Sequence, residues 1–237
     1  MAWDGRTVLA VVPARGGSKG APRKNVAEVG GVSLIGRVAA VIKALPWIDR
    51  ALISTDDPDF AAEARRHGLD APFLRPAELA SDDAAAADVW AHAWLAAEAQ
   101  HSTRFDASLY LQPTSPFRTP AHVEATMRAL LEGNRAAACT VSRVPGHFTP
   151  QKLLRRDQAG ILSFFTADGA RHKNRQTIPA YWYRNGYCYA ALRRTVVGHR
   201  HIVEEDCIGV PVDGPIVNID DPFELEVAQW LADRDEV

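Results

Sequence analysis

The sequence has little of what marks secreted, membrane-spanning or nucleic-acid-binding proteins. Its 237 residues hold three isolated cysteines, too few and odd in number for a disulfide framework, which favours a reducing cytoplasm. The formal net charge is −2, so no bulk attraction to nucleic acid or a membrane surface is expected. No apolar run approaches the ~20 residues of a membrane span, and the polar start does not resemble a signal peptide. We expect a cytoplasmic protein that binds neither nucleic acid nor a membrane.

Apolar runs typical of buried strands alternate with amphipathic stretches typical of helices. We expect strands at residues 7–12, 51–55, 107–112 and 136–142, and helices at 33–45, 59–67, 84–100, 119–132 and 222–233. This alternation predicts one α/β domain over residues 1–237, with a mostly parallel, doubly wound sheet. It breaks between residues 143 and 183, where we expect an inserted sub-domain, because a short connection between two strands would need less chain.

The stretch from Val11 to Asn25 combines glycines with cations directly after the first predicted strand. Glycine allows the backbone to turn N–H groups inward, and consecutive inward N–H groups form an anion site. Cations around such a site add charge-assisted hydrogen bonds, so the pattern favours a polyphosphate site over an ordinary basic surface loop. The spacing matches neither the Walker A loop nor the Rossmann glycine fingerprint. The members are Arg15, Gly16, Gly17, Lys19, Gly20, Arg23 and Lys24.

In parallel sheets, ligands bind beyond the carboxyl ends of the strands. The second predicted strand ends in Asp56 and Asp57. These carboxylates could hold a metal or a ribose, or they could form a turn that caps the next helix, and the sequence alone does not separate the two.

Two motifs resemble the acylneuraminate cytidylyltransferase family, which includes the CMP-sialic acid synthetases. The first is Pro-Ala-Arg-Gly-Gly-Ser-Lys-Gly at residues 13–20, followed by Pro22 and Lys24-Asn25. The second is Leu-Gln-Pro-Thr-Ser-Pro-Phe-Arg at residues 111–118. The resemblance implies a Rossmann-like fold of the nucleotide-diphospho-sugar transferase type. It also implies that residues 143–183 form a small protruding dimerisation sub-domain and that the protein is a homodimer.

The same resemblance implies a CTP site. Arg75 would donate to the carbonyl oxygen of cytosine, and the chain around Ala86 would accept from the exocyclic amine. The alternative for Arg75 is a surface arginine beside two prolines. The residues expected to bind the nucleotide are Ala14, Arg15, Gly16, Gly17, Ser18, Lys19, Lys24, Asn25, Arg75 and Ala86.

A small acidic sugar is the second substrate that the resemblance implies. Its expected contacts are Gln112, Arg175, Gln176, Tyr181 and Asn185. Arg175 suits a carboxylate because a guanidinium binds one with two parallel hydrogen bonds. The aromatic residues of the region around Tyr181 are expected at an interface or a pocket, or alternatively in a local core. Arg118 is expected either at the site or in a structural ion pair.

Members of the family typically have two aspartates, separated by one residue, that bind Mg²⁺. Here the matching positions are Asn218 and Asp220. Strand alternation would place both on one face, and a single carboxylate with substrate phosphates and water suffices for many Mg²⁺ sites. Asp221 is expected to cap the closing helix.

The resemblance therefore implies a Mg²⁺-dependent nucleotidyltransferase. It would transfer CMP from CTP to the anomeric hydroxyl of a sialic-acid-like keto-deoxy sugar acid and release pyrophosphate, with Arg15, Lys24 and Asp220 as catalytic residues. Two alternatives stay open: transfer to another acid, such as a KDO-like sugar or a phosphonate, and a nucleotide-binding homologue with impaired catalysis, of which Asn218 would be the trace.

Overall fold

The computed structural model describes residues 3–17, 20, 22–171, 178–203 and 205–234. The chain forms two compact units: Met1–Thr140 together with Asn185–Val237, and Val141–Arg184. No helix within the described ranges is long and apolar enough to cross a membrane.

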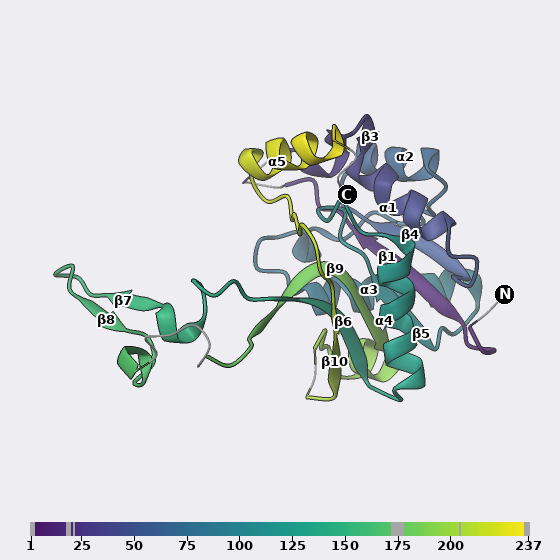
Figure 1. Cartoon of the computed structure of the whole chain (residues 1–237). Helices are drawn as coiled ribbons and strands as arrows, with labels where there is room; N and C mark the ends of the chain where they lie inside the picture. The colour runs from purple at the N-terminus through teal and green to yellow at the C-terminus, as the bar shows by residue number, and fades with distance from the viewer. Residues whose placement is uncertain (1–2, 18–19, 21, 172–177, 204, 235–237) are drawn as a thin grey trace. The chain divides into compact units, whose positions relative to one another are not determined.

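The first unit is built around a six-stranded sheet in the order β10-β6-β9-β5-β1-β4 (Figure 1). β1 pairs in parallel with both β4 and β5, whereas β5 pairs antiparallel with β9. The strands are β1 (Val8–Pro13), β4 (Arg50–Ser54), β5 (Ala107–Tyr110), β6 (Ala137–Arg143), β9 (Trp182–Leu192) and β10 (Cys207–Pro211). β6 and β9 extend across the boundary between the two units.

Helices cover both faces of this sheet. One face, with Val8, Ala10 and Val12 of β1, packs against apolar residues of α1, α2 and α4. On the other face, Trp90 Nε1 of α3 donates to Ser108 Oγ of β5 at 2.8 Å. The helices are α1 (Leu34–Lys43), α2 (Pro58–Arg66), α3 (Ala86–His101), α4 (Pro120–Glu132) and α5 (Pro222–Ala232), with shorter helical segments η1 (Lys24–Val26), η2 (Ala77–Leu79) and η6 (Arg194–Gly198). The predicted doubly wound α/β class is thereby confirmed.

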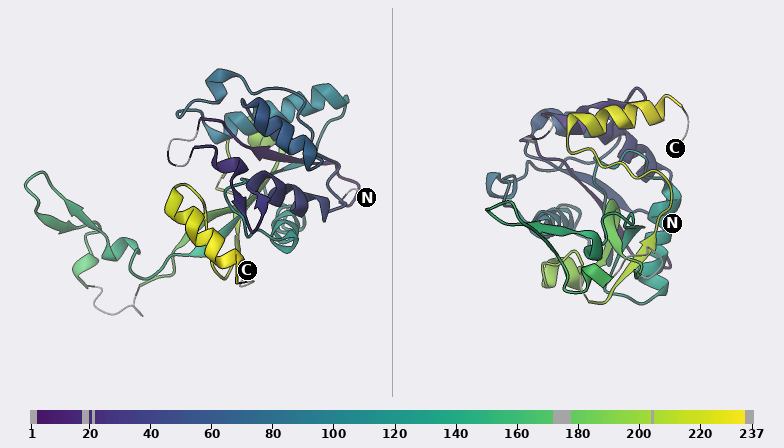
Figure 2. Two further views of the ribbon diagram at one scale, coloured as in Figure 1. Left: turned by 90° about the horizontal axis from the view of Figure 1, so that it is seen from above. Right: turned by 60° about the vertical axis from the view of Figure 1, so that its left-hand side comes forward.

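A second apolar core joins the two ends of the chain. Val29 of the small β2–β3 hairpin packs in one cluster with Val217 and Ile219, and with Leu231 of α5. The two strands are β2 (Glu28–Val29) and β3 (Val32–Ser33). α5 lies beside this hairpin in both Figure 1 and the left view of Figure 2, and the Gln229 side chain donates to the Glu28 carbonyl. This core brings the segment before α5 to the segment that follows the glycine-rich loop.

The second unit contains little regular structure. Its elements are η3 (Pro150–Lys152), β7 (Leu154–Arg156), β8 (Leu162–Phe164) and η4 (Gly169–Arg171). β7 and β8 form an antiparallel hairpin in which Leu154 lies opposite Phe164. The unit spans Val141–Arg184, and the sub-domain was expected at 143–183. Its role in dimerisation stays a prediction.

Candidate active site

A polar cavity of about 280 Å³ opens at the carboxyl ends of β1 and β5. Five separate segments of the first unit contribute to it: the glycine-rich loop, residues 75–86, the start of α3, the loop after β5, and the segment before α5. Its lining residues are Pro13, Arg15, Lys24, Asn25, Arg75, Leu79, Ser81, Asp82, Ala84, Ala86, Val89, Tyr110, Gln112, Pro113, Thr114 and Asp220. The cavity thus collects predicted nucleotide, acceptor and metal residues in one place.

Two ion pairs cross this cavity. Arg15 Nη1 lies 2.7 Å from Asp82 Oδ1, and Lys24 Nζ lies 2.7 Å from Asp220 Oδ1. Lys24 is only 13% exposed, whereas the Asp220 side chain is 77% exposed. The cationic loop and the carboxylate near the end of the chain therefore meet at one site, although 196 positions separate Lys24 from Asp220.

The glycine-rich loop is held by contacts with other segments of the first unit. The buried Asn25 donates from Nδ2 to the Arg15 carbonyl at 3.2 Å, and the Gly16 N–H donates to Asp56 Oδ1 at 2.9 Å. A Cβ on Gly20 would lie 2.3 Å from the Asp220 carbonyl oxygen. Gly20 is therefore required for the close approach of the loop to the Asp220 segment, a reason that the sequence did not reveal.

The carboxylates of Asp56 and Asp57 accept hydrogen bonds from backbone N–H groups. Asp56 accepts from Gly16, as above, and Asp57 Oδ1 caps α2 by accepting from the N–H groups of Asp59 and Phe60 at 2.8 and 3.3 Å. Neither carboxylate belongs to the cavity lining. Of the two readings left open by the sequence, the turn with a helix cap is the one that the structure has.

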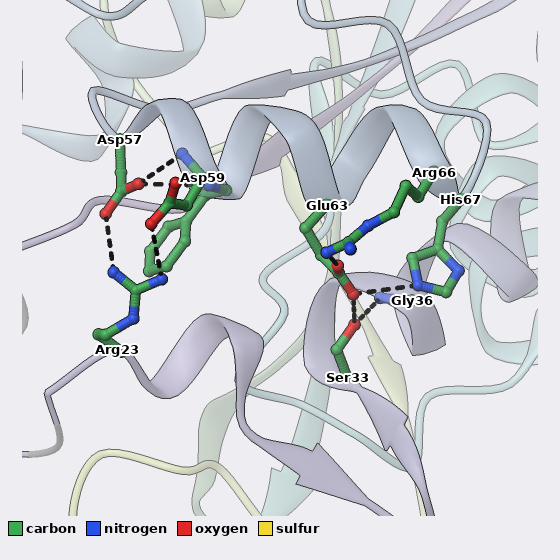
Figure 3. Close-up of polar contacts among 9 residues, drawn as sticks. Arg23, Ser33, Gly36, Asp57, Asp59, Glu63, Arg66 and His67 are labelled. Carbon is green, nitrogen blue, oxygen red and sulfur yellow. Dashed lines mark hydrogen bonds and ion pairs between the residues drawn. The ribbon is translucent and has the colours of Figure 1, made fainter.

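The end of the loop is fastened to α2 by Arg23. This residue has a left-handed backbone (φ +56°), and its guanidinium pairs with Asp59 at 3.1 Å (Figure 3). The guanidinium also lies over the Phe60 ring, 5.5 Å from its centroid. A left-handed φ is unusual outside glycine, and these contacts with α2 offset its cost.

A second connection joins α1 to α2 (Figure 3). Ser33 Oγ donates to Glu63 Oε1 at 2.5 Å and caps α1 by accepting from the Gly36 N–H at 3.0 Å. Glu63 also pairs with Arg66 and with His67 Nε2, the latter at 3.1 Å. The hydrogen bond from Ser33 is the main reason that the pKa of Glu63 lies below its ordinary value, with Arg66 and His67 adding to it against desolvation.

Arg75 is buried at 6% exposure, so the surface alternative is wrong. Its Nε donates to Ser54 Oγ at 3.1 Å and its Nη2 to the Ser54 carbonyl. A guanidinium has five N–H donors, which leaves capacity for a ligand in the cavity that Arg75 lines. Burial lowers the pKa of Arg75, with Tyr110 and Asp56 acting in the opposite direction.

The first turn of α3 also faces the cavity. Ala84 and Ala86 line it, and Ala85 occupies the N-cap position, where alanine offers no side-chain acceptor. The partial positive charge of a helix N-terminus adds to the cationic character of this wall.

Arg118 holds the loop after β5 from within the core. Its Nε donates to the Tyr187 carbonyl and its Nη2 to the Gln112 carbonyl at 2.6 Å. Complete burial lowers the pKa of this guanidinium to about 10. Arg118 is therefore structural, as one of its two expected roles required, although its partners are carbonyls. Gln112, whose carbonyl accepts from Arg118, itself lines the cavity.

The family comparison agrees with this geometry. A family model described as "Cytidylyltransferase" matches residues 9–179. The chain belongs to the cytidylyltransferase family. The glycine-rich loop and the residue 111–118 motif both fall within the matched range.

The chain is similar to several proteins that carry different names. Over 93% of its length the chain is 28% identical to an N-acylneuraminate cytidylyltransferase of Escherichia coli, but it spans only 51% of that protein. It is 24% identical to the post-translational flagellin modification protein B of Campylobacter coli, covering 94% of each. A CMP-N,N'-diacetyllegionaminic acid synthase of Legionella pneumophila is 35% identical over 48% of each chain.

Two solved structures share the fold. A CMP:2-keto-3-deoxy-manno-octonic acid synthetase in complex with CTP superposes with a TM-score of 0.70 at 18% identity, covering 97% of this chain and 99% of the other. A 4-diphosphocytidyl-2C-methyl-D-erythritol synthase from Anaerococcus prevotii superposes with a TM-score of 0.68 at 14% identity, covering 98% of each. At these identities the likeness establishes the fold class alone.

Two of the residues expected in this site lie outside the cavity lining. Asn185 has no exposed surface, and its Oδ1 accepts from Thr140 Oγ1 at 2.6 Å. Asn218 accepts from Ser115 Oγ at 2.7 Å and donates from Nδ2 to the Asn185 carbonyl at 2.8 Å.

The remaining expected acceptor contacts belong to the second unit or to undescribed residues. Tyr181 lines a cavity of about 580 Å³ within the second unit, where its hydroxyl accepts from Gln151 Nε2 at 2.6 Å. Ser18, Lys19, Arg175 and Gln176 lie outside the described residues.

Two ionisable residues of the cavity, Asp82 and Tyr110, were not among the residues expected at the site. Only the fold shows that Asp82 reaches Arg15. Tyr110 was counted as a core strand residue, but it also lines the cavity. Burial raises the pKa of Tyr110 above its ordinary value, so the phenol is neutral at pH 7 and available as a donor.

The described residues contain no cluster of three or more histidine, cysteine, aspartate or glutamate side chains arranged to hold a metal. Asp220 is nevertheless exposed in the cavity beside the cations that suit phosphate. One carboxylate, substrate phosphates and water form a common Mg²⁺ environment. The donor set therefore fits a Mg²⁺ ion that arrives with a nucleotide, with Asp220 as its protein ligand.

Proposed function

We propose that this protein transfers CMP from CTP to the anomeric hydroxyl of a sialic-acid-like keto-deoxy sugar acid. The observation that carries the proposal is the single cavity that joins Arg15 and Lys24 to Asp220 and Gln112. Anionic phosphates match the two cations, and membership of the cytidylyltransferase family supports CTP as the donor.

In the proposed reaction the acceptor's hydroxyl oxygen bonds to the α-phosphorus of CTP. The bond from that phosphorus to the oxygen bridging to the β-phosphate breaks, pyrophosphate leaves, and the hydroxyl proton passes to water. Arg15 and Lys24 stabilise the charge that develops on the phosphate oxygens, and Lys19 holds the leaving phosphates. Positioning and charge stabilisation of this kind carry most of the rate in phosphoryl transfer.

Mg²⁺ held by Asp220 would neutralise phosphate charge. Asp220 is paired with Lys24, and Asp82 with Arg15. Each cation thus has a carboxylate partner at the place where it would bind a phosphate, which limits repulsion between the two cations.

The base is expected at Arg75 and the first turn of α3. Arg75 donates to the carbonyl oxygen of cytosine, and the backbone near Ala84 and Ala86 accepts from its amine. Uracil presents a carbonyl where cytosine presents an amine, so acceptors at this position would select against UTP.

The relatives support the proposed acceptor class, because they include an N-acylneuraminate cytidylyltransferase and a CMP-N,N'-diacetyllegionaminic acid synthase. Gln112 supplies a donor and an acceptor for the sugar acid. Arg175, Gln176 and Tyr181 are proposed to complete the acceptor site from a second copy of the chain, as a homodimer. We propose that the reaction takes place in the cytoplasm, because the three cysteines are free thiols, which suit a reducing compartment.

The test is turnover of CTP and Mg²⁺ with N-acetylneuraminic, legionaminic and pseudaminic acids, with KDO, and with a simple phosphonate. Pyrophosphate release and the CMP product are measured, with UTP as the donor control. CMP transfer to a nine-carbon acid supports the proposal. Transfer only to KDO or the phosphonate replaces the acceptor class, and no transfer to any acid, with CTP still bound, indicates an impaired homologue.

A further inference from the structure

Polar groups from three segments of the first unit converge beside the cavity. Ser115 comes from the loop after β5, Asn185 and Gly186 from β9, and Asn218 from the segment before α5. Asn218 Oδ1 accepts from Ser115 Oγ at 2.7 Å, and Asn218 Nδ2 donates to the Asn185 carbonyl at 2.8 Å. We call Ser115, Asn185, Gly186 and Asn218 the amide junction.

The chemistry of the partners determines the orientation of the Asn218 amide. The backbone carbonyl of Asn185 only accepts, so the atom that faces it must be the NH₂ group. The Ser115 hydroxyl then donates to the Asn218 carbonyl oxygen. Asn218 is therefore bound at both ends, and an aspartate in its place would set an acceptor against the Asn185 carbonyl.

Gly186 provides the space in which these groups meet. Its φ is +78°, a region that favours glycine. A Cβ at this position would lie 3.0 Å from Asn218 Oδ1, 3.1 Å from Gln112 Oε1 and 3.3 Å from Ser115 Oγ. The absence of that Cβ lets the side chain of a cavity residue, Gln112, approach the junction.

The residue after Asn218 is also bonded to the loop after β5. The Ile219 N–H donates to the Thr114 carbonyl at 2.8 Å, and the Ile219 side chain has no exposed surface. Asp220 follows directly and reaches Lys24 at 2.7 Å. The loop after β5 and the segment before α5 are thus joined at two consecutive residues just before the catalytic carboxylate.

We propose that Asn218 is a positioning residue that sets Asp220 and Gln112 in register, and that it does not bind the metal. The inference rests on the proposed function for what Asp220 and Gln112 bind. Its physical basis is the pair of hydrogen bonds, which need an amide that donates at one end and accepts at the other. Asparagine at this position is therefore the residue that the local structure requires, and not the remnant of a lost metal ligand.

Asn218→Asp separates this role from metal binding, and Asn134→Asp, at the exposed end of α4, is the matched control. Amide hydrogen exchange without nucleotide or metal is the first readout. Loss of the donor should speed exchange at Ile219 by about tenfold or more, with a smaller change at Leu109 in the core. Equal acceleration at both amides, or none at Ile219, would overturn the inference, and this readout holds even if the protein turns over no CTP.

Steady-state kinetics in CTP and Mg²⁺ form the second readout. Asn218→Asp should lower kcat by about tenfold or more, with the Mg²⁺ concentration for half-maximal rate unchanged or raised, as expected when a catalytic group is misplaced by a fraction of an ångström. The double variant Ser115→Ala with Asn218→Ala should lose little more than the worse single variant, because both remove one junction. A lower Mg²⁺ requirement in Asn218→Asp would instead identify residue 218 as a metal ligand. If the loss of kcat in the double variant equals the product of the losses in the two single variants, the two residues act independently, which would contradict the inference.

Discussion

The two compact units differ in where they keep their apolar side chains. In the first unit, Val8 to Val12 of β1 have no exposed surface, and the side chains of Trp90 and Trp94 are completely buried. In the second unit every residue of β7 and β8 is exposed. Its exposed apolar residues are Phe148, Leu153, Leu154, Ile161, Leu162, Phe164, Phe165, Trp182 and Tyr183.

This difference suggests which of the two substrate sites is complete within one chain. The first unit buries its own core and brings residues that we propose to bind the nucleotide into one cavity, where two cations are paired with carboxylates. The second unit exposes an apolar surface of the kind that marks protein interfaces. We therefore expect nucleotide binding to be a property of one chain and completion of the acceptor site to need a second copy.

The largest effect is expected from the loss of Asp220 or of its partner Lys24. Asp220→Ala or Lys24→Ala should lower the rate of pyrophosphate release by about 10²–10³-fold, as loss of one well-placed charged group does in comparable sites. Lys43→Ala, an exposed lysine of α1, is the control and should keep the wild-type rate. Wild-type turnover in Asp220→Ala would remove the carboxylate from the mechanism.

Charging the apolar surface of the second unit should break the proposed dimer. Ile161→Glu combined with Leu162→Glu should weaken self-association by about tenfold or more, because burying an unpaired polar group costs about 1–3 kcal/mol. Sedimentation should show the monomer mass, while CTP binding by the first unit persists. Leu95→Glu on α3, also an exposed leucine, is the control, and a wild-type chain that is already monomeric would contradict the comparison.

The stability that Glu63 contributes by connecting α1 to α2 should depend on pH. The pKa of Glu63 is lowered in the folded state, mainly by the Ser33 hydroxyl, so its stabilisation is present above the unfolded pKa of about 4.3 and is lost as pH falls through the folded value. Glu63→Gln should cost about 1 kcal/mol at pH 7. Thermal melts should show the gap to wild type shrinking below about pH 4, and a gap that stays constant down to pH 2 would contradict the assignment.

The smallest effect is expected at the partner of Arg15. Asp82 is 43% exposed and would compete with phosphate for the guanidinium. Since exposed pairs contribute up to about 1 kcal/mol, Asp82→Asn should lower KM for CTP by about two- to fivefold. A raised KM would show instead that Asp82 contributes to nucleotide binding.

The sequence predicted the parallel part of the fold, and five of the polar residues that it expected at the site, Arg15, Lys24, Arg75, Gln112 and Asp220, line one cavity. Residues 8–13, 50–54 and 107–110 are strands close to the expected ranges because their apolar runs are bounded by glycine, proline or aspartate. Antiparallel β9 was not foreseen, since its residues 186–191 are all buried, without the alternation of buried and exposed residues that marks an antiparallel strand. Local pattern also does not show where a distant side chain ends up.

The site residues divide in the same way. Arg15, Lys24 and Asn25 belong to one contiguous motif, and its glycine and cation pattern is visible without the fold. Asn185 and Asn218 were assigned to ligands on the family resemblance, but in the fold Asn185 Oδ1 accepts from the Tyr187 N–H and Asn218 Nδ2 donates to the Asn185 carbonyl. Hydrogen bonds between segments more than 30 positions apart, such as Asn218 to Asn185, leave no mark in composition or spacing.

The central claim is that the glycine-rich loop and the carboxylate near the end of the chain bind the same triphosphate. A crystal structure with a non-hydrolysable CTP analogue and Mg²⁺ tests it most directly. The account predicts that Arg15 and Lys24 contact the phosphates while Asp220 binds the metal on those phosphates. A nucleotide bound with its phosphates away from either Lys24 or Asp220 would contradict it.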